Sequence, residues 1–182
     1  AVWQAPARYM SKGVAIIPNA LVVVAIYYPV AAAFSKANGF KREAAIDGLA
    51  VIEFAVPDER AAIDWLKKNA DSDHVLLEAV GDSYSEFGRI SAASGIPTPL
   101  GWPGHQLQWR GSDALYKGRS KDIEQIYTTQ DIETTKILLR KYDVTHVFIG
   151  QLERTRYQNI DVDKFDKFGR RVFDRNETVI YT

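Results

Sequence analysis

The chain has no cysteine and no excess of charge of either sign. Its 182 residues include 23 Lys and Arg, 23 Asp and Glu, and three His. Without cysteine there are no disulfides, no thiolate nucleophile and no cysteine-ligated metal. A balanced charge argues against nucleic acid as a general partner, because polyanion binding needs a basic surface. A chain of this length forms one domain, or one domain with an appendage.

Sequence motifs for several common chemistries are also missing. The chain has no GxGxxG dinucleotide fingerprint, no Walker loop and no GxSxG nucleophile elbow, and residues 81–85 (GDSYS) lack the glycine spacing of such an elbow. His74, His105 and His146 show neither HxH nor HExxH spacing, so no metal site is predicted. We expect no cofactor, and we give hydrolysis little weight.

A long apolar run stands near the start of the sequence. Residues 14–34 contain no charged side chain, and a bilayer core of about 30 Å needs about 20 apolar residues as a helix. Two prolines and an asparagine inside the run are compatible with a membrane helix. A buried helix and a signal sequence are the alternatives. The sequence predicts a transmembrane helix over residues 14–36, with residues 1–13 as the end of a preceding loop.

The remaining residues, 41–182, predict a soluble α/β domain. Apolar runs bounded by turn residues indicate strands, and apolar residues at helical spacing indicate the helices between them. We therefore expect a mixed, mostly parallel sheet with flanking helices and a C-terminal β-hairpin. The expected elements are an extended segment over 46–56, a helix from Pro57 to about Asn69, a strand over 74–80, a short helix over 90–93 before Gly95, a short or edge strand over 96–100, a helix over 122–127, a helix capped by Thr129 or Asp131, a strand over 144–149, and a hairpin around residues 174–177.

The segment from Gly101 to Gly111, GWPGHQLQWRG, has the most unusual composition in the chain. Glycine and proline predict an irregular loop, and such loops often carry sites. Trp102, His105, Trp109 and Arg110 together offer ring stacking, proton transfer and anion binding. A structural loop whose tryptophans fill a small core is an equal alternative. His105 is the histidine that we expect at a site, whereas packed or solvated roles are favoured for the other two.

Three groups of polar and aromatic side chains follow predicted strands. Ligands of open α/β sheets bind at the carboxyl ends of strands, so these groups converge on one rim if the strands are parallel neighbours. The candidate ligand-binding residues are Asp82, Tyr84, Arg89, Trp102, His105, Trp109, Arg110, Glu153 and Arg154.

Glu78 lies inside an apolar predicted strand. A buried carboxylate needs a partner, such as Arg89 or Arg110, and could serve either in a structural ion pair or as an acid or base.

The order of several sequence blocks resembles a known family. The apolar helix is followed, in this order, by IDGLAVI, AIDWLKKN, the stretch from LLEAVGDSY to GWPGHQLQWRG, DIEQIYTT and LLRKYDVTHVFIGQLER. This is similar to the C-terminal end of the Chlor_Arch_YYY family, which comprises very hydrophobic multi-pass membrane proteins of unknown function. The resemblance covers residues 14–182. It implies a terminal span and a soluble domain that accompany a larger membrane domain.

The general shape of that family is similar to glycosyltransferases that use lipid-linked sugars. The resemblance implies a soluble, extracytoplasmic domain at the cell membrane that shapes the site for a polyprenyl-phosphate sugar or a glycan. The catalytic acid would then lie upstream of residue 1, and this chain alone would not be catalytic. A non-catalytic partner-binding domain and a structural domain are the alternatives.

Overall fold

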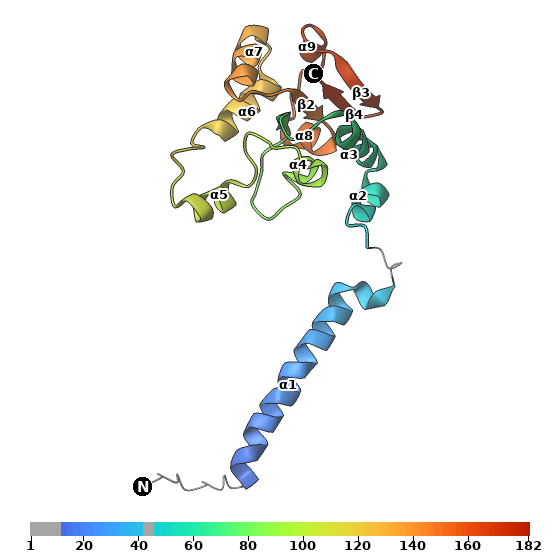
Figure 1. The fold of residues 1–182 in the computed structure, drawn as a ribbon, viewed down its shortest axis with the longest axis vertical. Coiled ribbons are helices and arrows are strands. Elements are labelled where there is room, and N and C mark those ends of the chain that lie inside the picture. Colours follow the sequence, from blue (N-terminus) through green and yellow to red (C-terminus); the bar gives the residue numbers. More distant parts are fainter. Residues whose placement is uncertain (1–11, 42–45) are drawn as a thin grey trace, which may run out of the picture. The chain divides into compact units, whose positions relative to one another are not determined.

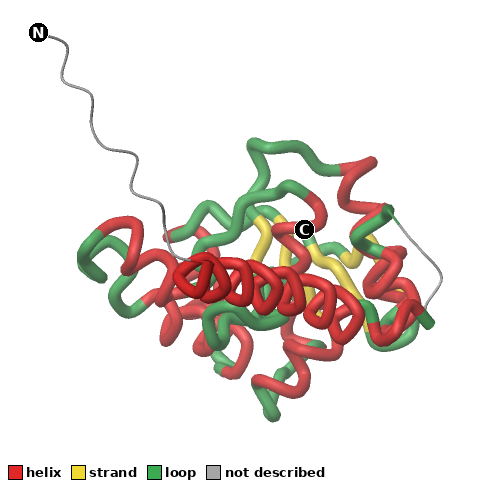
Figure 2. Tube along the Cα trace, turned by 90° about the horizontal axis from the view of Figure 1, so that it is seen from below, coloured by secondary structure: helices red, strands yellow, loops and turns green. Residues whose placement is uncertain are grey.

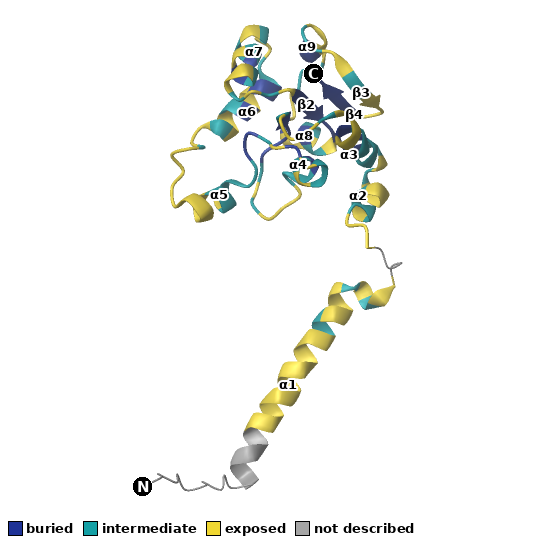
Figure 3. Cartoon of the chain, viewed as in Figure 1, coloured by how far each residue is buried: buried dark blue, intermediate teal, exposed yellow. Residues whose placement is uncertain are grey.

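The computed structural model describes residues 12–41 and 46–182 and divides into two compact units, residues 1–46 and 47–182. Most of the predicted loop end over residues 1–13 lies outside the described residues. Helix α1 (Lys12–Lys36) forms most of the first unit, and the short 3-10 helix η1 (Asn38–Phe40) follows it. Residues Pro18–Lys36 are long and apolar enough to cross a membrane, and none of their side chains is buried (Figure 3). A signal sequence near an N-terminus would meet the same criterion.

The second unit is a mixed α/β domain, as predicted (Figure 1). Its sheet has the strand order β1-β2-β4-β3, in which β1 pairs with β2 in parallel and the other two pairings are antiparallel. Parallel pairing is thus confined to one edge, so the sheet is mixed, as predicted, but not mostly parallel. The elements are α2 (Ala50–Ala55), α3 (Pro57–Asn69), β1 (Leu76–Leu77), α4 (Arg89–Ser94), α5 (Pro103–Arg110), α6 (Arg119–Thr128), α7 (Ile132–Lys141), β2 (His146–Ile149), α8 (Gln151–Arg156), α9 (Asp163–Asp166), β3 (Arg171–Arg175) and β4 (Thr178–Tyr181).

Helices pack on both faces of the sheet, and Figure 2 shows the strands among them. Successive side chains of a strand point to opposite faces. Val147 and Ile149 of β2 pack on one face with residues of α6, α7 and α9, whereas Phe148 packs on the other with residues of α3 and α4. Because β2 is buried on both faces, three apolar residues follow one another in it, from Val147 to Ile149, without alternation.

Local sequence signals account for several helix ends. Pro57 stands at the first turn of α3, where its missing N–H costs nothing. Asp131 caps α7 by accepting a hydrogen bond from the backbone N–H of Glu133 at 3.0 Å. Gly95 ends α4 in the left-handed conformation, with φ of 84°. The predicted starts and stops of these helices are confirmed, and so is the C-terminal hairpin of β3 and β4.

Three predicted elements differ from the structure. The extended segment predicted over 46–56 is wrong, because residues 50–55 form helix α2. Short apolar runs do not distinguish a strand from a helix, and here Leu49 and Ile52 pack against the core beside α3. The strand predicted over 74–80 is limited to Leu76–Leu77. Residues 96–100 form no strand, although Pro97 O accepts a hydrogen bond from Leu76 N at 2.8 Å.

Candidate functional site

The segment that the sequence predicted as an irregular loop is largely helical. Pro103–Arg110 forms helix α5, so the loop prediction is wrong for these residues. Proline suits the first turn of a helix, and Gly111 ends α5 in the left-handed conformation with φ of 67°. The glycine and proline that suggested a loop are thus the boundary residues of a short helix. As a result, His105 and Trp109 stand one turn apart on the same face.

Four aromatic rings form one contiguous cluster on this helix and the loop beside it. We call Tyr84, Trp102, His105 and Trp109 the aromatic shelf. The ring centroids of Tyr84 and Trp102 are 5.2 Å apart, and His105 lies 5.6 Å from Tyr84, 6.0 Å from Trp102 and 5.6 Å from Trp109. His105 is nearly parallel to Tyr84 and Trp102, at interplanar angles of 27° and 26°. The shelf has one histidine at its centre.

An open hollow of about 560 Å³ adjoins the shelf. It is lined by Trp102, His105, Gln106, Trp109 and Arg110, and we call it the aromatic hollow. Trp109 is 81% exposed, which is unusual for so large an apolar ring. The Arg110 Nε donates to Gln106 Oε1 at 2.9 Å, which leaves the two terminal nitrogens of the guanidinium for other acceptors. The aromatic hollow therefore combines apolar ring faces with a positive charge.

Hydrogen bonds join α5 to the loop after β1. The backbone N–H of Gly104 donates to Ser83 Oγ at 2.8 Å, and a Cβ at position 104 would lie within 2.8 Å of that oxygen. The Trp102 indole N–H donates to Phe87 O, and the Tyr84 hydroxyl donates to Gln108 Oε1 at 2.6 Å. Two segments that the sequence analysis treated separately thus form one surface.

Arg89 and Glu153 take part in a buried ionic group. We call Glu59, Glu78, Glu153 and Arg89 the carboxylate cluster, in which the three acids are 0–1% exposed. Arg89 Nε donates to Glu59 Oε2 at 2.8 Å, and Arg89 Nη2 lies 3.9 Å from Glu153 Oε2. The cluster forms because the segments after the parallel strands β1 and β2 meet at one end of the sheet.

Backbone amides hold two of the buried carboxylates. Glu78 accepts hydrogen bonds from the N–H groups of Ile90 and Ser91, both at 3.0 Å, so its main partners are amides and not the arginine side chains that we considered. Glu153 accepts from Ala79 N at 3.0 Å and from Gly150 N at 2.9 Å. Burial, followed by the negative charge of Glu153, raises the pKa of Glu78 to about 7. Burial also raises the pKa of Glu153.

The other candidate residues take different positions. Arg154 donates through Nε to Glu177 O at 3.2 Å, beside the C-terminal hairpin. Asp82 is exposed in the loop after β1, where its carbonyl oxygen accepts from the Ser85 hydroxyl. The structure therefore brings Tyr84, Trp102, His105, Trp109 and Arg110 together, places Arg89 and Glu153 in the carboxylate cluster, and leaves Arg154 with the hairpin.

The sequence analysis missed two close pairs. Glu59 is the ion-pair partner of Arg89, and the signal was available, because Glu59 stands at helical spacing from the buried Ala62, Ile63 and Leu66. The rings of His74 and His146 also meet, 5.0 Å apart. Burial, with a smaller contribution from His74, lowers the pKa of His146. Sequence spacing could not indicate that pair, because the parallel pairing of β1 and β2 creates it.

No family model matches the chain, and no curated protein matches it. The resemblance to the Chlor_Arch_YYY family therefore stays a prediction. Among solved structures, the chain is similar to the C-terminal globular domain of an oligosaccharyltransferase from Archaeoglobus fulgidus. The TM-score is 0.44 at 12% identity, with 68% of this chain and 95% of the other covered. At that level the likeness says nothing about activity. What the chain itself shows is a mixed α/β domain that follows one helix long and apolar enough to cross a membrane.

Proposed function

We propose that the domain binds a saccharide through the aromatic shelf, as a non-catalytic, substrate-shaping part of a membrane glycosyltransferase. The observation that carries this proposal is the cluster of aromatic rings beside the aromatic hollow, with Trp109 81% exposed. Ligand sites are concave, and they combine apolar or aromatic walls with a few polar groups. The apolar face of a sugar ring packs on an aromatic ring, and the hydroxyl groups around it suit the Gln106 amide and the Arg110 guanidinium.

The chemistry of the lining supports binding without catalysis. The residues that line the aromatic hollow include no carboxylate, so the described site lacks the paired acids that glycosyl transfer or hydrolysis commonly uses. The carboxylates of Glu78 and Glu153 are fully buried and already accept backbone hydrogen bonds. The catalytic acid would then belong to membrane segments upstream of this chain, and a lipid-linked sugar would fit a domain that follows a membrane span.

A second function, partner binding or structural support, is favoured by one residue. Trp102 is partly buried, and its indole N–H is bound to Phe87 O, as expected for a ring that holds the loop in place. Trp109 has no such bond among the described residues. Saccharide binding therefore requires the exposed Trp109 ring, whereas structural support requires only Trp102.

The test is a saccharide titration of the complete chain in detergent micelles. The chain has four tryptophans, so each indole N–H gives a separate NMR signal. With monosaccharides, short glycans and a polyprenyl-phosphate sugar analogue, we expect saturable shifts of the Trp102 and Trp109 signals. Trp65, whose ring lies beside His146 and Phe173 and is not part of the aromatic shelf, is the internal control. Trp109→Ala should abolish the shifts without unfolding the domain.

Two outcomes would contradict the proposal. If a folded chain shows no shifts with any saccharide, the partner-binding or structural function gains support. If shifts occur but persist in Trp109→Ala, the saccharide binds elsewhere in the domain. A pull-down that recovers a stoichiometric partner and loses it in Trp109→Ala would favour the partner-binding alternative directly.

A further inference from the structure

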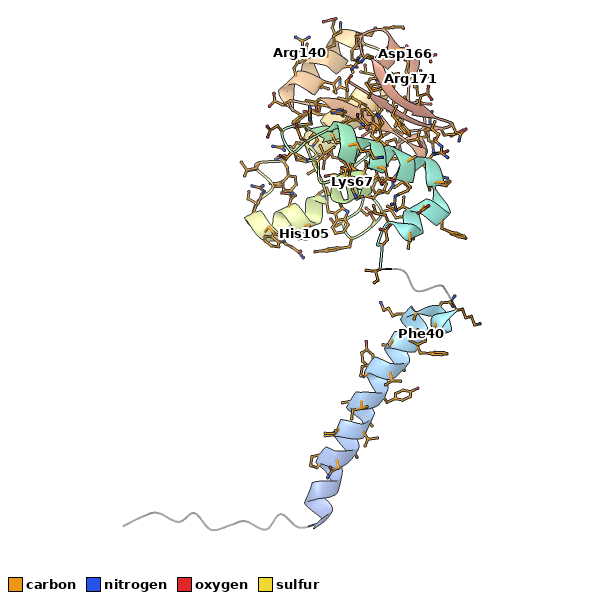
Figure 4. The ribbon with its side chains drawn as sticks, turned by 45° about the vertical axis from the view of Figure 1, so that its right-hand side comes forward. Phe40, Lys67, His105, Arg140, Asp166 and Arg171 are labelled. Carbon is orange, nitrogen blue, oxygen red and sulfur yellow. The ribbon has the colours of Figure 1, made fainter. Side chains whose placement is uncertain are left out.

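A second, more polar hollow lies on the other side of Arg110. Its volume is about 230 Å³, and we call it the arginine hollow. It shares Gln106 and Arg110 with the aromatic hollow, so the two are adjacent on the same end of the domain. His105 of α5 marks this end in Figure 4, and Arg140 of α7 lies at the opposite end. The lining residues are Thr98, Pro99, Leu100, Gln106, Arg110, Leu115, Tyr116 and Arg119.

The two arginines of this hollow carry charges that no carboxylate neutralises. Among the described residues, no acidic oxygen lies within 4.0 Å of either guanidinium. By contrast, Arg171 pairs with Asp166, and both residues are labelled in Figure 4. Arg171 also pairs with Asp174. Two positive charges that line one hollow favour an anion as its occupant, because the anion relieves their repulsion.

Both guanidinium groups are already held in position. Arg119 Nη1 donates to Pro99 O at 2.7 Å, and its guanidinium lies 5.6 Å from the centre of the Tyr142 ring. Arg110 is held at Nε by Gln106. Side chains fixed before binding lose less conformational entropy when a ligand arrives, so this arrangement favours binding.

The two arginines supply the charged donors of this hollow. Thr98 also lines it, but its hydroxyl oxygen is buried beneath the surface and does not face the opening. Guanidinium groups present several N–H donors in fixed directions. Two of them suit a phosphate, which carries a larger charge and more acceptor oxygens than a carboxylate.

We propose that the arginine hollow binds the phosphate group of a glycosyl phosphate whose sugar ring lies on the aromatic shelf. The phosphate half of this assignment rests on Arg110 and Arg119, and the sugar half rests on the function proposed above. Arg119 lines only the arginine hollow, whereas Arg110 lines both hollows. A variant at Arg119 therefore separates the two halves.

The experiment is calorimetric titration of the complete chain in detergent micelles with glucose 1-phosphate, methyl glucoside and inorganic phosphate. Glucose 1-phosphate should bind at least tenfold more tightly than either of the other two. Arg119→Gln should weaken the binding of glucose 1-phosphate by about tenfold and leave the binding of methyl glucoside unchanged. Arg140→Gln, which removes an exposed arginine at the opposite end of the domain, is the matched control and should change nothing.

The outcomes distinguish the two proposals. If methyl glucoside and glucose 1-phosphate bind equally, the phosphate site is overturned and the saccharide site stands. If only phosphate groups bind, in an Arg119-dependent manner that Trp109→Ala does not change, the anion site stands and the saccharide function fails. Inorganic phosphate that binds as tightly as glucose 1-phosphate would overturn the assignment to a sugar phosphate. If Arg140→Gln weakens the binding of glucose 1-phosphate as much as Arg119→Gln does, the net charge of the protein, and not the arginine hollow, accounts for the binding.

Discussion

At the residue scale, the two tryptophans of this segment have different environments. Trp102 precedes helix α5, and Trp109 lies within it. Trp102 is partly buried and donates a hydrogen bond to Phe87 O, whereas Trp109 is mostly exposed. The sequence could indicate that both belong to one segment, but burial depends on which side of the helix faces the loop after β1. The structural and the ligand-binding interpretations of this segment therefore apply to different residues.

This difference predicts opposite effects on stability. Trp102→Ala should lower the free energy of unfolding by about 1–3 kcal/mol, because Phe87 O loses its donor and the ring leaves a void. Trp109→Ala should change it by less than about 1 kcal/mol, since little of its surface is buried. Urea unfolding followed by circular dichroism measures both. Equal losses in the two variants would contradict this assignment.

The carboxylate cluster predicts a dependence of stability on pH. The pKa of Glu78 is raised from 4.5 to about 7, so the folded state holds this proton more tightly than the unfolded state. Protonated Glu78 therefore contributes to the free energy of unfolding. This contribution is fully present below pH 4.5 and is lost as the pH rises through 7, by about 3 kcal/mol at most. In Glu78→Gln this loss should be absent. The test is to measure the unfolding free energies of the unaltered protein and of Glu78→Gln between pH 4 and pH 8. Parallel dependences on pH in the two proteins would refute the prediction.

At the element scale, the caps and boundary residues determine where helices begin. Asp131 caps α7 through Glu133 N, and its second oxygen accepts from the Thr134 hydroxyl at 2.5 Å. The same rules place Pro57 at the start of α3 and Pro103 at the start of α5. In the segment 101–111, the composition indicated a loop. The helix there is so short that the glycines and the proline near its ends outnumber the apolar residues inside it.

Removing the cap of α7 should destabilise the domain modestly. Asp131→Ala leaves the first N–H groups of the helix without this acceptor, and we expect a loss of about 1 kcal/mol in unfolding free energy. Asp131→Asn keeps an acceptor and should lose less. Thermal unfolding of the three proteins measures the difference. Equal losses in Asp131→Asn and Asp131→Ala would contradict this, because they would show that the charge of Asp131, and not its hydrogen bond, stabilises the helix.

At the scale of the whole molecule, the chain has two units of different character. The described side chains of α1 are largely exposed and apolar, whereas the domain of residues 47–182 buries two apolar layers around its sheet. Exposed apolar surface of this length is stable in a bilayer and not in water. Membrane association is therefore expected to depend on α1 alone.

Charges placed in the centre of α1 test this expectation. Val23→Lys together with Val24→Lys should prevent insertion, because each lysine costs about 2.5–3.5 kcal/mol at the centre of a span. Flotation with lipid vesicles should then leave the variant in the soluble fraction. Ile137→Lys, which replaces an exposed apolar residue of α7, is the control and should float like the unaltered chain. Flotation of the double variant would mean that other residues hold the chain on the membrane.

The sequence alone determined the apolar helix, the mixed α/β class, the ends of α3, α4 and α7, and the C-terminal hairpin, because each depends on local composition, period or capping. The tertiary structure alone decided which distant residues meet. The parallel pairing of β1 with β2 brings Glu78 to Glu153 and His74 to His146, and the packing of the loop after β1 against α5 completes the aromatic shelf. Contacts of this kind depend on strand order and burial, which local sequence does not encode.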